Sequence, residues 1–140
     1  MINGRIIHPA ILSALAAAGH RSTILVSDAH YAATTAVGGN AAVVYLNLEQ
    51  GTPTIPHVVE LLASYLPFEK RTTMGTPGPE FGEVQLEIGA ILGADVAHES
   101  LERGDFYAAA RSQDLALCIV TGDTRRFGNV LLTVGVNTGQ

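Results

Sequence analysis

The sequence predicts an α/β fold with three layers, in which helices cover both faces of a largely parallel central sheet. Short, continuously apolar segments alternate along the chain with segments of helical spacing. Strands that consist of continuous apolar runs are typical of parallel sheets, because such sheets are buried on both faces. The 140 residues contain no low-complexity tract, repeat or long linker, so we expect one domain over residues 1–140.

The first half of the chain predicts two helices and two strands. Residues 8–18 are rich in alanine, with a proline in the first turn and a glycine after the end, a pattern typical of a helix. The β-branched and apolar segments 22–27 and 41–46 predict buried strands. Residues 56–66 return to helical spacing, with their apolar side chains on one stripe.

The second half continues the alternation. Residues 72–79 are rich in threonine, glycine and proline and predict a surface loop. Helical segments are expected over 79–92 and 101–112, although their internal glycines each cost about 1 kcal/mol. The apolar segments 115–121 and 130–134 predict two further buried strands.

The composition limits the classes of partner. The chain is 47% hydrophobic but only 15% charged, against about 25% charged residues in ordinary soluble domains. We therefore expect part of the surface to be buried against copies of the same chain. Eight basic residues against thirteen acidic ones give a net charge of −5, which predicts no nucleic-acid partner and no anionic membrane partner. No apolar segment approaches the ~20 residues of a membrane span, and the N-terminus does not resemble a signal peptide.

Cysteine and histidine give no sign of a metal centre. The single cysteine, Cys118, lies in the apolar segment LALCIVT and is interpreted as a buried thiol. No disulfide can form within the chain, which fits a cytoplasmic location. The five histidines show no i, i+4 spacing, and no phosphate-binding glycine loop follows any strand. We therefore expect neither a metal nor a cofactor.

His20 is the first candidate for chemistry. It follows the glycine that ends the first predicted helix, and an imidazole titrating near neutrality suits general acid–base catalysis. The alternative is that His20 only caps the carbonyls of that helix.

Asp28 is the second candidate, because it ends the first predicted strand. Polar groups at the carboxyl ends of parallel strands line the usual ligand crevice of open α/β sheets. His30 and Tyr31 follow at once, so this turn is expected to present a carboxylate, an imidazole and a phenol to a sugar hydroxyl. The alternatives are an aspartate that only begins a turn and a solvated loop.

Two further candidates come from the C-terminal half. The guanidinium of Arg103 suits a carboxylate or a vicinal diol, unless Arg103 pairs with Glu99 or Glu102 on the helix surface. The segment TGDTRRFGN, residues 121–129, joins the last two strands. Its asparagine offers a donor and an acceptor, and the alternative is a simple hairpin or crossover turn.

The order of these segments resembles the RbsD/FucU family of sugar mutarotases, the D-ribose pyranases and L-fucose mutarotases. The chain carries, in order, the motifs AAxGH, SDAH, FYxxAR and TGDxRxFGNxLLTVGV. The resemblance is strongest over residues 19–30 and 106–136, whereas 49–99 matches only in helical character. The SDAH form, with His30, is more similar to the fucose branch. The resemblance implies an RbsD-like fold and ring-like homo-oligomers, commonly decamers.

The resemblance also implies roles for particular residues. It gives His20 the place of the proton donor and Asp28 that of a substrate-binding carboxylate. Arg103 falls on a position that is arginine or histidine in the two branches. The substrate-binding tripeptide before the last strand corresponds to Phe127, Gly128 and Asn129. Members of the family normally have tyrosine at the first of these positions, so this chain lacks one hydroxyl.

These features predict a cofactor-free isomerase that interconverts the anomers or ring forms of a free monosaccharide. The alternative is a non-catalytic sugar-binding or transport-accessory protein on the same scaffold. An extended chain from His20 to Asp28 covers up to ~26 Å, more than a monosaccharide bridges. Either the turn after His20 doubles the chain back, or another subunit completes the site.

Overall fold

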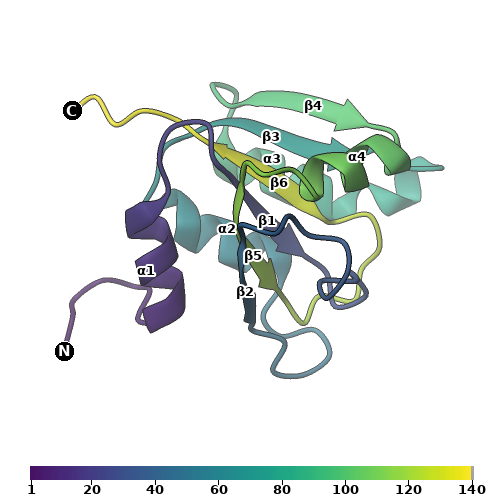
Figure 1. Ribbon diagram of the computed structural model, residues 1–140. Helices are drawn as coiled ribbons and strands as arrows, with labels where there is room; N and C mark the ends of the chain where they lie inside the picture. Colours follow the sequence, from purple (N-terminus) through teal and green to yellow (C-terminus); the bar gives the residue numbers. More distant parts are fainter. Residues whose placement is uncertain (140) are drawn as a thin grey trace.

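A mostly parallel sheet of six strands crosses the part of the chain that the structure describes, residues 1–139 of a computed structural model (Figure 1). In spatial order the strands are β2 (Ala42–Tyr45), β5 (Leu115–Val120), β1 (Thr23–Ser27), β6 (Val130–Val134), β3 (Phe68–Met74) and β4 (Ala97–Leu101). The β2–β5, β5–β1 and β3–β4 pairs are parallel, whereas β6 runs antiparallel to both β1 and β3. The predicted α/β class is therefore confirmed.

Helices cover both faces of this sheet, as the three-layer prediction requires. They are α1 (Pro9–Ala17), α2 (Ile55–Ala63), α3 (Glu83–Leu92) and α4 (Arg103–Ala110), with a 3₁₀ turn, η1 (Pro79–Phe81), before α3. The first three helices share one apolar cluster, and α4 contributes to a separate cluster with other strand residues. No helix within residues 1–139 combines the length and apolar character that a bilayer span requires.

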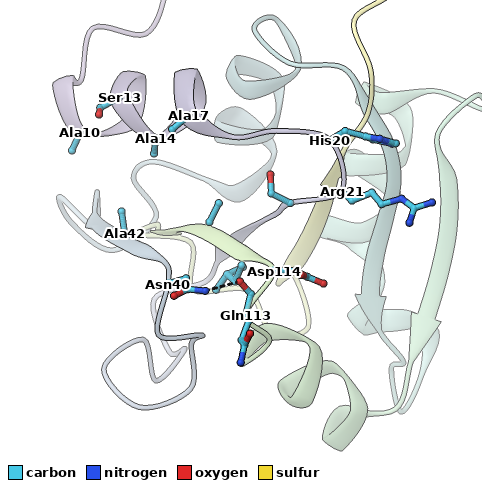
Figure 2. A pocket seen from close by; sticks show the side chains of 13 residues that line it. Ala10, Ser13, Ala14, Ala17, His20, Arg21, Asn40, Ala42, Gln113 and Asp114 are labelled. Atoms are coloured by element: carbon cyan, nitrogen blue, oxygen red, sulfur yellow. Dashed lines mark hydrogen bonds between the residues drawn. The ribbon is translucent and has the colours of Figure 1, made fainter.

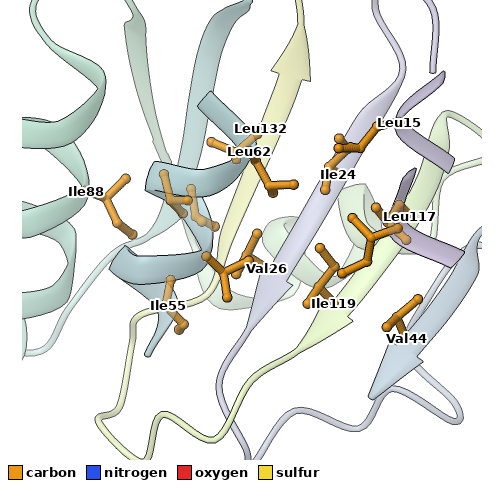
Figure 3. Packing of buried hydrophobic residues seen from close by; sticks show 14 of the residues in the cluster. Leu15, Ile24, Val26, Val44, Ile55, Leu62, Ile88, Leu117, Ile119 and Leu132 are labelled. Carbon is orange, nitrogen blue, oxygen red and sulfur yellow. The ribbon is translucent and has the colours of Figure 1, made fainter. Parts of the chain in front are cut away.

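Alternating side chains of β1 pack into the two apolar clusters on opposite faces of the sheet. Ile24 and Val26 are fully buried on the side of α1, α2 and α3, where Figure 3 shows Leu15 and Leu62 close to them. Leu25, between them in sequence, is equally buried in the cluster of α4. Successive strand residues point to opposite faces, so a strand covered by helices on both sides needs the continuous apolar run that the sequence shows.

Two strands at one side of the sheet were not expected. The prediction that a surface loop begins at residue 72 is wrong, because Thr72, Thr73 and Met74 are buried in β3. Thr72 and Thr73 pair with both β6 and β4, and Met74 pairs with β4. The loop begins at Gly75. β4 is an edge strand whose residues are exposed apart from the half-buried Leu101, so its sequence carries no apolar run. The other predicted elements are present, and their ends differ by four residues or fewer.

Candidate functional site

Asp28 and Asn129 meet at the carboxyl edge of β1. Asp28 directly follows β1 and Asn129 directly precedes β6. Because these strands are antiparallel neighbours, with Val26 opposite Val130, the end of one lies beside the start of the other. The backbone N–H of Asp28 donates to Oδ1 of Asn129 at 2.7 Å. The connection from β5 to β6 is therefore a crossover past the end of β1 and not a hairpin.

A pocket of about 260 Å³ opens at this edge. Its volume lies just below the ~300–1,000 Å³ typical of ligand pockets, which fits a ligand of monosaccharide size. Nine residues line it: Asp28, His30, Tyr31, Met74, Arg103, Tyr107, Arg126, Phe127 and Asn129. Six of them were predicted as site residues, from three separate segments of the chain.

The carboxylate of Asp28 lies at the buried end of this pocket. The residue is only 5% exposed, and its Oδ1 accepts a hydrogen bond from the backbone N–H of His30 at 2.9 Å. Burial raises the pKa of Asp28, and the hydrogen bond from His30 opposes this in part. Asp28 thus does begin a turn, as the alternative held, but it also lines the pocket. No lysine or arginine pairs with it within residues 1–139.

The amide of Asn129 is oriented by Asp28. A backbone N–H can only donate, so Oδ1 of Asn129 must face Asp28, and the Nδ2 group lies on the other side of the amide. In the described part of the chain, Nδ2 makes no hydrogen bond, whereas Oδ1 accepts the one from Asp28. The lining therefore combines carboxylate oxygens with two N–H donors, which is the pairing that binds a hydroxyl group as donor and as acceptor.

His30 and Tyr31 differ in what they offer. Nε2 of His30 lies 3.2 Å from the carbonyl oxygen of Thr124; since a carbonyl only accepts, Nε2 carries the proton and the lone pair of a neutral ring is on Nδ1. The hydroxyl of Tyr31 donates to the carbonyl of Ala36 at 2.6 Å, and burial raises the pKa of this phenol. The expected phenol donor is thus turned into its own loop, and only the ring of Tyr31 faces the pocket, against Tyr107.

Arg103 lies over an aromatic ring instead of pairing with a carboxylate. Its Cζ atom is 5.6 Å from the centre of the Tyr107 ring, and no ion pair to Glu99 or Glu102 is found among residues 1–139. The surface-pair alternative is not observed. The guanidinium donors of Arg103 remain available at the edge of the pocket.

Phe127 lines the pocket, whereas Gly128 lies behind it. Phe127 has a left-handed backbone, with φ of 61°, and Nε2 of Gln85 donates to its carbonyl at 3.0 Å. Gly128 does not line the pocket. A Cβ there would lie 2.9 Å from Cγ1 of Val84 and 3.0 Å from Cδ1 of Ile55, so the glycine lets the chain pass close to α2 and α3.

His20 lies near the amino end of β1, whereas Asp28 lies at its carboxyl end. It follows α1 and precedes β1, which spans about 13 Å from end to end. Its Nε2 is 3.0 Å from Oε2 of Glu69, both side chains being about half exposed, and it makes no contact with the end of α1 that would cap the helix. Figure 2 shows His20 and Arg21 at the end of a groove between α1 and the amino ends of β2 and β5. The chain does not double back to bring His20 to Asp28.

Three lining residues were missed by sequence reasoning. Met74 lies in the segment interpreted as a loop, so nothing indicated its position. Tyr107 and Arg126 stand inside the motifs FYxxAR and TGDxRxFGN, and a signal was available there. An α4 residue one turn beyond Arg103 shares its face of the helix, and Arg126 directly precedes Phe127.

Neither a metal centre nor an exposed thiol is found among residues 1–139. Residues 1–139 contain no group of three or more histidine, cysteine, aspartate or glutamate side chains placed to hold a metal ion. Cys118 is fully buried in β5, and burial raises the pKa of its thiol to about 11, which matches its interpretation as an inert core residue.

Comparison with known protein families identifies the relatives of this chain. A profile of the RbsD / FucU transport protein family matches residues 1–137. The chain belongs to the RbsD/FucU family. A search of curated protein sequences gave no significant match.

Solved structures show the same fold. RbsD of Bacillus subtilis in complex with D-ribose is 22% identical, with a TM-score of 0.85 over 98% of this chain and 99% of that one. The fucose mutarotase of Streptococcus pneumoniae in complex with L-fucose is 20% identical, with a TM-score of 0.75 over 94% and 95%. FucU of Bifidobacterium longum is 26% identical, with a TM-score of 0.71 over 94% and 95%. The predicted family is confirmed, and the comparisons do not separate its ribose and fucose branches.

Proposed function

We propose that this RbsD/FucU protein is a cytoplasmic, cofactor-free sugar mutarotase that interconverts the anomers or ring forms of a free monosaccharide. The observation that carries the proposal is the hydrogen bond by which the backbone N–H of Asp28 orients the Asn129 amide, with both side chains at the buried end of a pocket of monosaccharide size. These two residues bind the ring hydroxyls, and Arg103 orients the sugar from the edge. The SDAH motif, similar to the fucose branch, makes L-fucose the first substrate to test.

The reaction requires only proton transfers. Ring opening takes a proton from the anomeric hydroxyl and delivers one to the ring oxygen; rotation about the C1–C2 bond and reclosure reverse both transfers. Acid–base assistance of this kind typically contributes ~10²–10⁴-fold. Asp28 accepts a hydrogen bond from a hydroxyl, Asn129 donates to one, and a histidine moves the proton.

We assign that histidine to His20 of a neighbouring copy. Within one chain His20 lies at the amino edge of the sheet and Asp28 at the carboxyl edge, so His20 cannot reach a sugar held by Asp28. Contact between the amino edge of one copy and the carboxyl edge of the next is a head-to-tail contact, which generates a ring when the rotation closes. The family resemblance favours a decamer.

Exchange NMR on free sugars tests the activity. Saturation transfer between the anomeric protons of L-fucose, D-ribose, D-galactose and L-rhamnose reports the interconversion rate with and without protein. We expect acceleration for at least one sugar and its loss in His20→Ala. An unchanged exchange rate in His20→Ala would refute the assignment of His20.

Co-expression of two inactive variants tests the shared site. If each site takes His20 from one copy and Asp28 from the next, mixing His20→Ala with Asp28→Asn in one assembly leaves about a quarter of the sites intact. A site contained in one chain leaves none intact. Recovery of activity in the mixture, measured against each variant alone, therefore supports the shared site, and no recovery rejects it.

Phe127 favours a second candidate, a non-catalytic sugar-binding protein. Its ring stands at the pocket where family members carry a tyrosine hydroxyl, and it contacts Phe81 edge to face at 5.1 Å between ring centres. If the missing hydroxyl relays a proton, this pocket binds sugar without opening the ring. Binding detected by calorimetry with no acceleration of anomer exchange selects this function.

A further inference from the structure

The two arginines of the pocket have no acidic partner. Arg125, which precedes Arg126 in the loop before β6, pairs with Asp123 at 2.8 Å and with Glu87 at 2.9 Å. By contrast, no carboxylate lies within ion-pair distance of Arg103 or Arg126 across residues 1–139. Both line the pocket, so their charges face the ligand without being neutralised by the chain.

Aromatic rings hold the two guanidinium groups. Cζ of Arg126 is 5.3 Å from the centre of the Phe127 ring and 5.5 Å from that of Phe81, and Arg103 lies over Tyr107. Stacking on a ring uses the face of a guanidinium and leaves its N–H donors in the plane free. Such planar donor sets match the oxygens of a carboxylate or a phosphate.

The charges are arranged along the depth of the pocket. Asp28 and Asn129 are each 5% exposed and form its buried end, whereas Arg103 and Arg126 are exposed and form its edge. The chain as a whole carries a net charge of −5, yet two cations stand against one carboxylate here. A neutral monosaccharide uses the groups of the buried end and Arg103, which suits a vicinal diol, but it has no group that requires a second free arginine, Arg126, at the edge.

We propose that the ligand of this pocket is a monosaccharide with an anionic substituent, either a carboxylate or a phosphate. The ring hydroxyls contact Asp28 and Asn129, and the anion lies between Arg103 and Arg126, away from the carboxylate of Asp28. This inference rests on the proposed sugar site and specifies its substrate class.

Matched ligands that differ in one substituent test the proposal. D-galactose, D-galacturonate and D-galactose 6-phosphate share one ring, and D-glucose, D-glucuronate and D-glucose 6-phosphate share another. Dissociation constants are measured by calorimetry on the full-length protein in 50 mM NaCl. In at least one series we expect an acidic member to bind about tenfold more tightly than the neutral sugar, as charge-assisted hydrogen bonds provide. Comparison of the uronate with the sugar phosphate shows which of the two anions is preferred. In 0.5 M NaCl the difference in affinity between acidic and neutral sugars should become smaller, because salt screens the charges.

Variants of the two arginines test whether these side chains cause the preference for acidic ligands. Arg103→Gln and Arg126→Gln should each weaken the acidic ligand several-fold more than its neutral counterpart. Arg5→Gln removes an exposed ion pair with Glu60 of α2, and neither residue lines the pocket, so this variant should change neither affinity. Neutral members binding as tightly as the acidic ones in both series, or an acidic preference that survives both pocket variants, overturns the inference.

The same ligands separate this inference from the proposed function. Accelerated anomer exchange of neutral sugars without any acidic preference keeps the mutarotase and rejects the anionic substrate. Acidic preference without accelerated exchange keeps the ligand class and rejects the mutarotase. If no ligand of either series binds, and none of the four panel sugars binds or exchanges faster, both are rejected.

Discussion

Two buried aspartates at the same edge of the sheet should respond in opposite ways to the loss of their charge. Asp123 is 2% exposed, and its oxygens accept from Nε of Arg125 at 3.0 Å, from Nη2 at 2.8 Å and from the backbone N–H of Ile55 at 3.0 Å. Although burial works in the other direction, these hydrogen bonds lower the pKa of Asp123. Asp28 is almost as buried but lacks a cationic partner, and burial raises its pKa.

The two shifts have opposite consequences for stability. The lowered pKa of Asp123 means that its ionised form stabilises the fold above the unfolded-state pKa of about 3.9, and that this stabilisation is lost as pH falls. The raised pKa of Asp28 means that its ionised form destabilises the fold at neutral pH. That destabilisation disappears as pH falls below about 4, where the carboxyl is protonated in both states.

Replacement of each aspartate by asparagine isolates the charge, because the side chain keeps its size and one acceptor oxygen. Asp123→Asn should cost about 1–3 kcal/mol at pH 7, given one buried partner and an Arg125 side chain that is 31% exposed. At about 3–4 °C per kcal/mol for a chain of this length, Tm falls by about 3–12 °C. Asp28→Asn retains an acceptor for the N–H of His30 and removes the buried charge, so its Tm should equal or exceed that of the wild type.

Thermal unfolding at pH 7 and pH 4, at matched protein concentration, is the assay. At pH 4 the difference for Asp28→Asn should largely disappear, because this carboxyl is then mostly protonated in the folded state. The difference for Asp123→Asn should largely persist at pH 4, because the lowered pKa keeps this carboxyl ionised in the folded state. Sugar binding gives the complementary readout: Asp28→Asn loses a charge-assisted hydrogen bond of about 1.5–3 kcal/mol, or roughly 10- to 150-fold in affinity. A drop of more than about 3 °C for Asp28→Asn at pH 7 would contradict the interpretation of Asp28 as a residue kept for function at a cost in stability.

Three further predictions concern the remaining site residues. His20→Ala should change Tm by no more than about 3 °C, because the exposed pair with Glu69 contributes only ~0–1 kcal/mol; a larger drop would give His20 a structural role. Phe127→Tyr restores the hydroxyl that the family resemblance places there and should raise the anomer-exchange rate, whereas Phe127→Leu, which also lacks it, should not. His30→Ala should reduce exchange less than His20→Ala does in parallel saturation-transfer measurements; the reverse order would move the acid–base role to Nδ1 of His30.

The central strands could be predicted from the sequence because helices bury both of their faces. Leu25 and its neighbours in β1 are fully buried, so their apolar run identifies a strand without knowledge of the fold. β3 and β4 lack this property. β4 lies at the edge with mostly exposed residues, and β3 combines charged residues with buried threonines. Their strand character arises from pairing with β6 and with each other, which depends on residues far away in the sequence.

Some residues of the site could likewise be predicted from the sequence, and others could not. Asp28 and Asn129 could be predicted because each stands at the end of a recognisable strand, where α/β sheets collect polar groups. The hydroxyl of Tyr31 could not be placed, because its hydrogen bond to Ala36 is a local choice of the turn. Nor could the unpaired state of Arg126 be predicted, since the adjacent Arg125 takes the carboxylates.

The low charge content and the placement of His20 both favour the proposed assembly of several copies. A chain with 15% charged residues leaves apolar side chains at its surface, among them Tyr45, Leu48 and Leu86, which are 55%, 79% and 77% exposed. Burial of such side chains between copies stabilises an oligomer by about 25 cal/mol per Å² of apolar surface removed from water. If that contact joins the amino edge of one sheet to the carboxyl edge of the next, the burial that holds the ring also brings His20 to Asp28. Under the proposed mechanism assembly is then a condition of catalysis, whereas the proposed binding residues Asp28, Asn129 and Arg103 all line the pocket of the single chain.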